Sequence, residues 1–223
     1  MVTAMAAKNR RAPPDALMLL GTHCPHCPKV LQGLSELVKS GELGGLKVVN
    51  IEQHPEIAVE LGVRSVPWVR IGSFDLEGLR TPAEYRAWVL RAGTQEGMAA
   101  YQGELLSAGK VHSVVTLLQK DSSHFAALLL LLADTETELN VRIGIGAVME
   151  ELQAGELLRS MVMPLGELTK HADPRVRSDA CHYLGLSGSH QALPIVQPLL
   201  GDSSEEVREI AQDTLILLKE SGA

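Results

Sequence analysis

Residues 15–38 read DALMLLGTHCPHCPKVLQGLSELV, and this stretch decides the fold of the first part of the chain. The apolar run 16–20 is typical of a short buried strand. The apolar residues of 30–38 recur at the spacing of one helix face, and Gly41 follows as a helix stop. A second apolar run, 46–51, completes a strand, a helix and a parallel strand. The sequence therefore predicts one βαβ unit.

Two cysteines lie between this strand and this helix, in the segment Gly21-Thr22-His23-Cys24-Pro25-His26-Cys27. We expect Cys24 at the N-terminal end of the helix, where free N–H groups and the helix dipole lower the pKa of a thiol. Cys27 follows one turn into the helix, more buried and within bonding reach, so it can attack a mixed disulfide at Cys24. His26 adds a donor or a positive charge beside the Cys24 sulfur. The spacing predicts a redox-active cysteine pair.

Zinc sites use the same two-residue spacing between cysteines. A closed zinc site needs four protein ligands, usually from two such pairs, and the chain contains only one. His23, Cys24, His26 and Cys27 could bind zinc or copper, but four ligands within five consecutive residues would strain a tetrahedral cage. We therefore expect no metal and no cofactor, and metal carriage stays as an alternative.

Four more elements are expected before residue 97: a helix over 55–61, a strand over 68–71, a hairpin partner near 74–77 and a helix after Thr81. Thr81 suits the N-cap of that last helix, and Glu84 completes a capping box. Gly93 follows the final turn.

Three segments of this part together resemble the thioredoxin superfamily: Cys24-Pro25-His26-Cys27 after a strand, residues 50–58, and Gly62-Val63-Arg64-Ser65-Val66-Pro67. The resemblance implies a thioredoxin-like α/β fold over 15–97 and thiol–disulfide oxidoreductase activity. The partners that it implies are a protein disulfide or dithiol client and, as electron donor, glutathione or a reductase. It makes Cys24 the nucleophile and Cys27 the resolving cysteine.

The same resemblance identifies Pro67 as a cis-proline that faces the redox pair, with Val66 offering backbone groups to an extended substrate. Trp68 follows directly and either lines the peptide groove or belongs to the strand core. His23 completes the candidate substrate contacts. The sequence also departs from thioredoxins, because the buried acid and its lysine partner would fall at Met18 and near Val48. Activation of Cys27 would then depend on water, His26 or His23.

The net charge and the hydrophobic periodicity of the sequence change near residue 97. Residues 1–97 have a net charge of +1 and residues 98–223 a net charge of −8, and the second part is rich in Leu, Ala and Glu at helical spacing. Gly93–Gly97 is a plausible hinge. We expect a flexible tail over 1–14, one domain over 15–97 and an all-α domain over 98–223.

A degenerate repeat runs through this second part. Val-Arg recurs as Val141-Arg142, Val176-Arg177 and Val207-Arg208, and each pair opens an amphipathic helix. Ala180 and Ala211 follow at the same offset, where a small residue lets helices approach closely.

Such helical hairpins cannot bury their apolar faces alone, so they stack into a solenoid. We expect residues 192–200 to form the second helix of one repeat. The pattern resembles HEAT-like repeats of the short kind found in phycobilisome lyases, which implies an α-helical solenoid for protein binding. An irregular helical bundle is the alternative.

Composition excludes several classes of protein. The net charge of −7 and the aromatic content of 3% argue against nucleic-acid binding. The longest apolar run, 125–133, is about half of a membrane span, and the run 16–20 is too short for a secretory signal. We therefore expect a cytoplasmic protein without a membrane partner. Cys181 is expected as a small buried residue, with a thiol that relays to the redox pair as the alternative.

Together these patterns predict a thiol–disulfide oxidoreductase whose HEAT-like domain recruits a protein client. A redox-regulated adaptor without turnover is the rival hypothesis.

Overall fold

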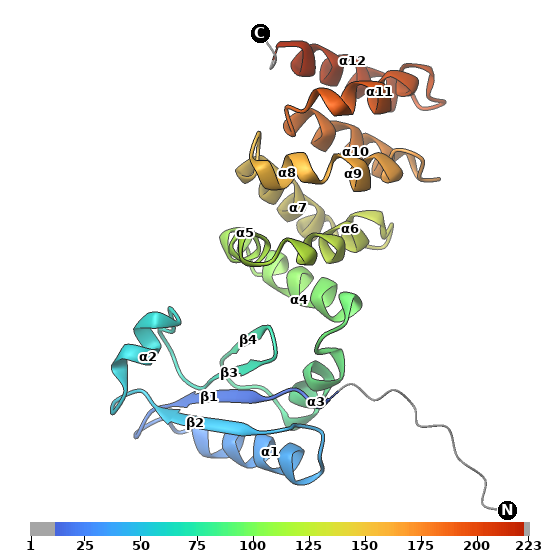
Figure 1. Cartoon of the computed structure of the whole chain (residues 1–223). Helices are drawn as coiled ribbons and strands as arrows, with labels where there is room; N and C mark the ends of the chain where they lie inside the picture. Colours follow the sequence, from blue (N-terminus) through green and yellow to red (C-terminus); the bar gives the residue numbers. More distant parts are fainter. Residues whose placement is uncertain (1–11, 221–223) are drawn as a thin grey trace, which may run out of the picture. The chain divides into compact units, whose positions relative to one another are not determined.

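The computed structural model of this protein describes residues 12–220 (Figure 1). The first eleven residues of the tail expected over 1–14 lie outside the described residues. The chain divides into two compact units, Met1–Met98 and Ala99–Ala223.

A four-stranded sheet forms the centre of the first unit. β1 (Ala16–Leu20) pairs in parallel with β2 (Leu46–Asn50) and antiparallel with β3 (Trp68–Ile71). β3 continues antiparallel into β4 (Phe74–Glu77), so the strand order is β2-β1-β3-β4. The predicted βαβ unit and hairpin are therefore confirmed, with β2 one residue shorter than expected.

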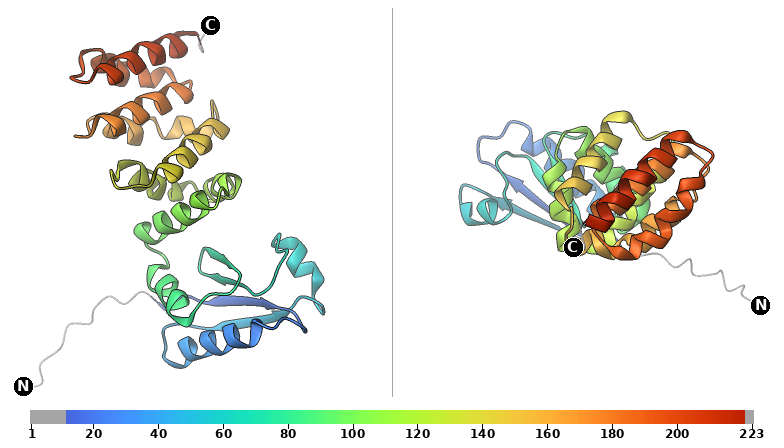
Figure 2. Two further views of the ribbon diagram at one scale, coloured as in Figure 1. Left: turned by 180° about the vertical axis from the view of Figure 1, so that it is seen from behind. Right: turned by 90° about the horizontal axis from the view of Figure 1, so that it is seen from above.

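Helices cover both faces of this sheet (Figures 1 and 2). α1 (Cys27–Lys39) buries the apolar face that was expected, including Leu34 and Leu37. On the other face, Leu19, Val49 and Trp68 form a core cluster. Ile57 of α2 (Pro55–Glu60) packs against that cluster. A thioredoxin-like α/β fold follows from this arrangement.

α3 (Pro82–Arg91) begins with the predicted capping box. The Glu84 N–H donates to Thr81 Oγ1 at 3.3 Å, and the Thr81 N–H donates to Glu84 Oε2 at 2.7 Å. Gly93 follows with a φ of 71°, a left-handed conformation that favours glycine. Part of the segment expected as a hinge, 93–97, is helical, because α4 (Gln95–Ser107) already begins at Gln95. Thr94 Oγ1 accepts the Gly97 N–H at 2.8 Å and so ties that first turn.

The described part of the second unit is built from helices. Its elements after α4 are α5 (Val111–Lys120), η1 (Ser122–His124), α6 (Phe125–Ala133), α7 (Leu139–Glu151), α8 (Glu156–Ser160), α9 (Val162–Leu168), α10 (Pro174–Leu186), η2 (His190–Ala192), α11 (Leu193–Val196), η3 (Gln197–Gly201) and α12 (Glu205–Glu220). In residues 12–220 no helix is long and apolar enough to cross a membrane.

The three Val-Arg pairs lie in the first turns of α7, α10 and α12, as predicted. Ala180 and Ala211 are fully buried. α10 packs closely on α12, since a Cβ on Gly185 would lie 3.1 Å from Thr214 Cγ2. The alanines are buried as expected, and the tight contact between the two helices is at Gly185.

Residues 192–200 do not form the single helix that was expected. The segment divides into η2, α11 and the 3-10 helix η3. Pro198 explains the division, because proline lacks the N–H that an α-helix needs and its ring clashes with the carbonyl four residues earlier.

The arginine of each pair has a role that the sequence analysis did not predict. Arg177 Nη1 donates to the carbonyl oxygens of His171 and Ala172 at 2.9 Å, and the guanidinium forms a two-point ion pair with Asp202. Arg208 Nη1 likewise donates to the Asp202 carbonyl oxygen at 2.8 Å. Each of these arginines thus satisfies backbone groups of the loop before its own helix.

Candidate functional site

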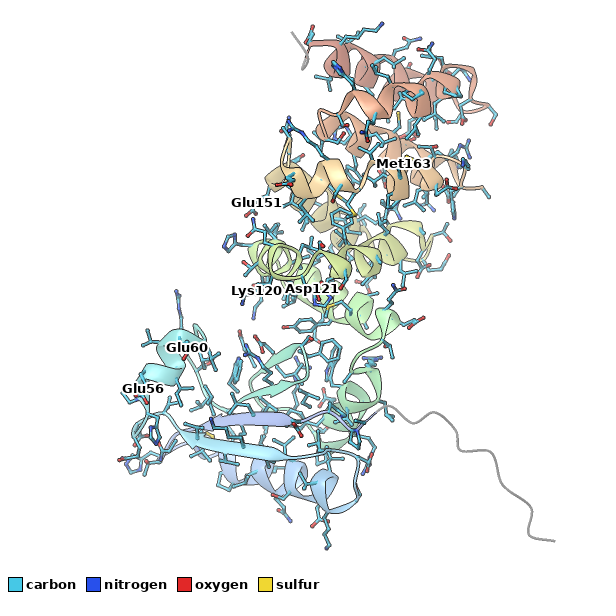
Figure 3. All side chains as sticks on the ribbon, in the orientation of Figure 1. Glu56, Glu60, Lys120, Asp121, Glu151 and Met163 are labelled. Carbon is cyan, nitrogen blue, oxygen red and sulfur yellow. A yellow bond between two sulfur atoms is a disulfide. The ribbon has the colours of Figure 1, made fainter. Side chains whose placement is uncertain are left out.

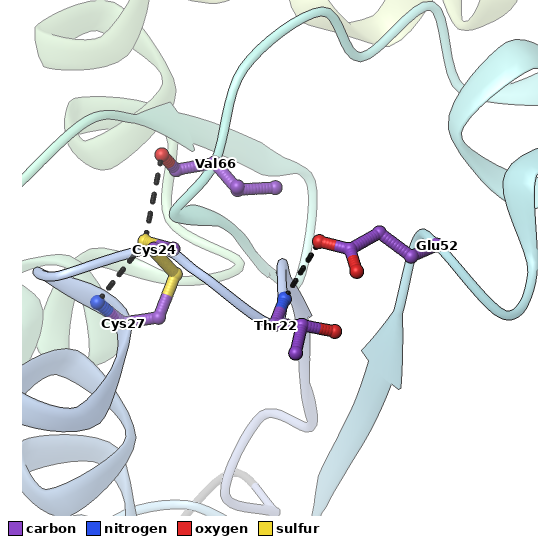
Figure 4. The surroundings of a disulfide bond; sticks show 5 residues. All are labelled: Thr22, Cys24, Cys27, Glu52 and Val66. Carbon is purple, nitrogen blue, oxygen red and sulfur yellow. Dashed lines mark hydrogen bonds between the residues drawn. A yellow bond between two sulfur atoms is a disulfide. The ribbon is translucent and has the colours of Figure 1, made fainter.

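Cys24 and Cys27 are joined by a disulfide, with Cα atoms 5.5 Å apart (Figure 4). Cys24 lies in the turn after β1, and Cys27 is the first residue of α1. The strand and the helix of the βαβ unit therefore hold the two sulfur atoms together at one end of the sheet.

The helix begins later than expected. His26 is the N-cap of α1, so Cys24 lies two residues before it and Cys27 is not one turn inside. Pro28 in the first turn explains this start, because proline is favoured where its missing N–H is not needed. Cys24 nevertheless receives a hydrogen bond from the helix end, since the Cys27 N–H donates to its Sγ at 3.2 Å.

The two cysteines differ in exposure. Cys24 is half-buried, whereas Cys27 is 2% exposed. An incoming sulfur atom can approach only the accessible partner of such a pair. The geometry therefore favours Cys24 as the attacked or attacking atom and Cys27 as the internal partner.

The Val66-Pro67 peptide bond is cis, as the resemblance implied. The Val66 carbonyl oxygen lies 3.8 Å from Cys24 Sγ, and Pro67 is buried (Figure 4). The loop before β3 and the redox pair therefore share one site.

Trp68 lies in the sheet core. Its side chain is 3% exposed and packs with Leu19 and Val49, while the Arg70 guanidinium lies 5.0 Å from the ring centroid. The core alternative fits this placement, and we do not carry Trp68 forward as a substrate contact.

His23 and His26 are both exposed, on either side of Cys24 in the sequence.

Met18 and Val48 occupy the positions where thioredoxins carry a buried acid and its lysine partner. Met18 is fully buried and pairs with Val48 across β1 and β2, so these two positions are neighbours. Among the described residues, no group of three or more His, Cys, Asp and Glu side chains could hold a metal ion.

A hydrogen-bonded network beside the cysteines was not predicted. The Thr22 N–H donates to Glu52 Oε1 at 2.8 Å, and Asn50 Nδ2 donates to Thr22 Oγ1 at 3.0 Å. Hydrogen bonding to Thr22, through its side chain first and its backbone N–H second, holds the pKa of the Glu52 carboxyl below its usual value. Asn50 and Glu52 belong to the segment that carried the family resemblance, but their contact with Thr22 depends on the parallel pairing of β1 and β2.

Comparison with protein-family models supports both halves of the expected architecture. Residues 16–90 match the model of a thioredoxin domain, and residues 125–216 match the model of HEAT repeats. No curated protein matches the chain. The predicted fusion of a thioredoxin-like domain with HEAT-like repeats is confirmed.

Proposed function

We propose that this protein is a cytoplasmic thiol–disulfide oxidoreductase that acts on a protein client. The observation that carries the proposal is the disulfide itself: a half-buried Cys24 bonded to a buried Cys27, with the Val66 carbonyl 3.8 Å from Cys24 Sγ. Cys24 exchanges with the client, and Cys27 closes or opens the internal disulfide.

The reaction balances without a cofactor. When the client is oxidised, its thiolate attacks Cys24 Sγ, the Cys24–Cys27 bond breaks and Cys27 leaves as the thiolate. A second client thiolate then attacks the client sulfur of the mixed disulfide and displaces Cys24. The client loses two electrons, the protein gains them, and two protons pass to the cysteine thiols. Reduction of a client follows the same steps in reverse, with glutathione or a reductase supplying the two electrons.

The pair is suited to this exchange because the N-terminal end of α1 points a backbone N–H at the Cys24 sulfur. The Cys27 N–H that points at Cys24 Sγ stabilises a thiolate there, so Cys24 is the better nucleophile and leaving group. With Met18 and Val48 in the places of the missing ionisable pair, we expect water or the exposed His23 or His26 to exchange the Cys27 proton.

The HEAT-like repeats support client recruitment in the proposal. Leu139 and Ile143 are 73% and 65% exposed, one turn apart on α7, and Met163 of α9 is also exposed (Figure 3). Exposed apolar side chains on a repeat scaffold are suited to protein contacts. A binding surface linked to a reactive site can raise the effective concentration of the client.

The same repeats favour a second candidate, a redox-regulated adaptor. In that case the disulfide would change the binding of a partner but would not turn over.

Turnover separates the two candidates. The assay follows reduction of a disulfide-linked peptide pair by catalytic amounts of the full chain, with excess glutathione as donor. Many peptide disulfides reduced per protein, and loss of that activity in Cys24→Ser, support the oxidoreductase. Stoichiometric reaction only, combined with partner binding that differs between the dithiol and disulfide forms, would favour the adaptor.

A further inference from the structure

Three residues connect the end of β2 to the turn that carries Cys24, and Figure 4 shows the bond between two of them, Thr22 and Glu52. Glu52 Oε1 accepts the Thr22 N–H at 2.8 Å, and Asn50 Nδ2 donates to Thr22 Oγ1 at 3.0 Å. The Glu52 N–H in turn donates to Asn50 Oδ1 at 2.9 Å. We call this set, Thr22, Asn50 and Glu52, the bracket. Asn50 and Glu52 are bonded to each other and to Thr22 in the turn.

The bracket reaches the redox pair through Gly21. A Cβ on Gly21 would lie 3.3 Å from Glu52 Oε1 and 3.4 Å from Val66 Cγ2, so Gly21 fits between the carboxylate and the residue before the cis-proline. The Gly21 carbonyl oxygen accepts the Cys24 N–H at 3.2 Å. Glu52 therefore binds Thr22, the residue after Gly21, and Gly21 in turn accepts the Cys24 N–H.

The bracket does not include the disulfide. None of its hydrogen bonds involves a sulfur atom, and Glu52 lies on a separate segment that follows β2. Opening the Cys24–Cys27 bond removes one constraint on the turn and directly breaks none of these hydrogen bonds.

We propose that Glu52 is a positioning residue of the redox site, which keeps Cys24 beside Cys27 after reduction. This inference rests on the proposed function. A turn that stays ordered in the dithiol keeps the two sulfur atoms at a high effective concentration for ring closure. Without the bracket, the dithiol gains conformational freedom and is favoured over the disulfide.

The measurement is the equilibrium of the full chain with glutathione. Two glutathione molecules lose two electrons and two protons to the Cys24–Cys27 disulfide, which gives the dithiol and one glutathione disulfide. Alkylation of the free thiols and mass measurement give the fraction of each form.

Two substitutions separate the hydrogen bonds of Glu52 from its charge. Glu52→Gln removes the charge and keeps an oxygen that can accept the Thr22 N–H, whereas Glu52→Ala removes both. Glu56→Ala is the matched control, because Glu56 is a neighbouring exposed glutamate that pairs with His54 (Figure 3). It removes the same charge outside the bracket.

We expect Glu52→Ala to shift the equilibrium toward the dithiol by about three- to tenfold, the size of one net hydrogen bond. On the two-electron scale this is about 14 to 30 mV. Glu52→Gln and Glu56→Ala should stay within about twofold of the wild type, since exposed charges interact weakly across water. An unshifted Glu52→Ala protein, or equal shifts in Glu52→Ala and Glu52→Gln, would overturn the inference.

A second measurement reports the bracket directly. Hydrogen exchange of the Thr22 amide, followed by NMR in the reduced protein, should be slow in the wild type and in Glu52→Gln and fast in Glu52→Ala. Fast exchange in the reduced wild type would overturn the inference, because the bracket would then be absent from the dithiol.

The two proposals fail in different ways. A wild-type protein with no reversible glutathione couple overturns the proposed function and this inference with it. A wild-type protein with a normal couple that Glu52→Ala leaves unchanged overturns only the inference.

Discussion

At the scale of single residues, Cys24 and Cys27 are bonded to each other but have different surroundings. Cys24 is half-buried beside the Val66 carbonyl, and Cys27 is enclosed at the start of α1. The third cysteine, Cys181, is fully buried, its Sγ lies 3.8 Å from Thr214 Oγ1, and burial raises the pKa of its thiol to about 11. The expectation of a small buried residue at Cys181 fits this environment, which disfavours a relay thiol.

The first prediction concerns the two members of the pair. Cys24→Ser should lower peptide-disulfide turnover by more than about 100-fold, because no other accessible thiolate is available. Cys27→Ser should instead accumulate a mixed disulfide between Cys24 and the peptide, since the resolving sulfur is gone. Non-reducing mass measurement detects the adduct. A mixed disulfide that forms on Cys27 in Cys24→Ser at the same rate would contradict the assigned roles.

At the scale of elements, the loops before α10 and α12 are held by arginines. Arg177 forms a two-point ion pair with Asp202, and both side chains are largely buried. The same guanidinium binds two carbonyl oxygens of the loop before α10. A planar guanidinium can serve all of these acceptors at once, which a lysine ammonium cannot.

The second prediction follows from this geometry. Arg177→Ala should lower the free energy of unfolding by about 3 kcal/mol, because it leaves a buried carboxylate and two carbonyl oxygens without their partner. Arg177→Lys should recover less than half of that loss. Urea unfolding followed by circular dichroism measures both. Arg208 donates to the Asp202 carbonyl oxygen in the loop before α12. The unfolding free energy of Arg208→Ala therefore serves as a comparison for that of Arg177→Ala. An Arg177→Ala protein as stable as the wild type would contradict the role of the guanidinium.

The third prediction concerns acid. The Arg177 guanidinium holds the pKa of Asp202 below 3.8, and the Arg175 side chain lowers the pKa of Asp173 to about 2. A carboxyl whose pKa is lower in the folded protein stabilises the fold above its unfolded pKa and loses that contribution as the pH falls through the folded value. Stability should therefore decrease between about pH 4 and pH 2. Urea unfolding at pH 5 and pH 3 measures the loss of unfolding free energy on acidification. That loss should be smaller in Asp202→Asn than in the wild type, and an equal loss would contradict the role of Asp202.

Sequence patterns predicted the elements best where one local rule decides the structure. The capping box at Thr81 is of this kind, whereas the cis bond at Pro67 was expected only from the family resemblance. The start of α1 and the division of 192–200 were missed, because prolines inside an apolar pattern changed the helix boundaries. The bracket could not be predicted, since Asn50, Glu52 and Thr22 meet only after the two parallel strands have paired.

At the scale of the whole molecule, one chain combines a thioredoxin-like unit with a unit of HEAT-like repeats. The net charge of −8 over residues 98–223 favours a client with a basic surface. The exposed Leu139 and Ile143 on α7 add an apolar contact that such a client can use.

The fourth prediction tests this division of labour. Ile143→Glu should raise the KM for a protein client by about tenfold and leave turnover of glutathione-linked small disulfides unchanged, because a small disulfide does not need the apolar contact that the repeats offer a protein client. Leu90→Glu, at an exposed leucine on α3, is the matched control and should change neither the KM for the protein client nor the turnover of small disulfides. If Ile143→Glu lowered the activity on the protein client and on small disulfides equally, recruitment of the client by the repeats would be contradicted.

The central claim is that Cys24 and Cys27 form a reversible redox couple. The most direct test is a glutathione redox titration of the purified, metal-free full chain, followed by thiol alkylation and mass, with Cys27→Ser as the control. We expect one reversible transition in which two thiols appear together, and its midpoint can be compared with a cytosolic poise of roughly −220 to −320 mV. Failure of the wild-type pair to form or open a disulfide anywhere in that titration would show that the two cysteines are not a redox couple.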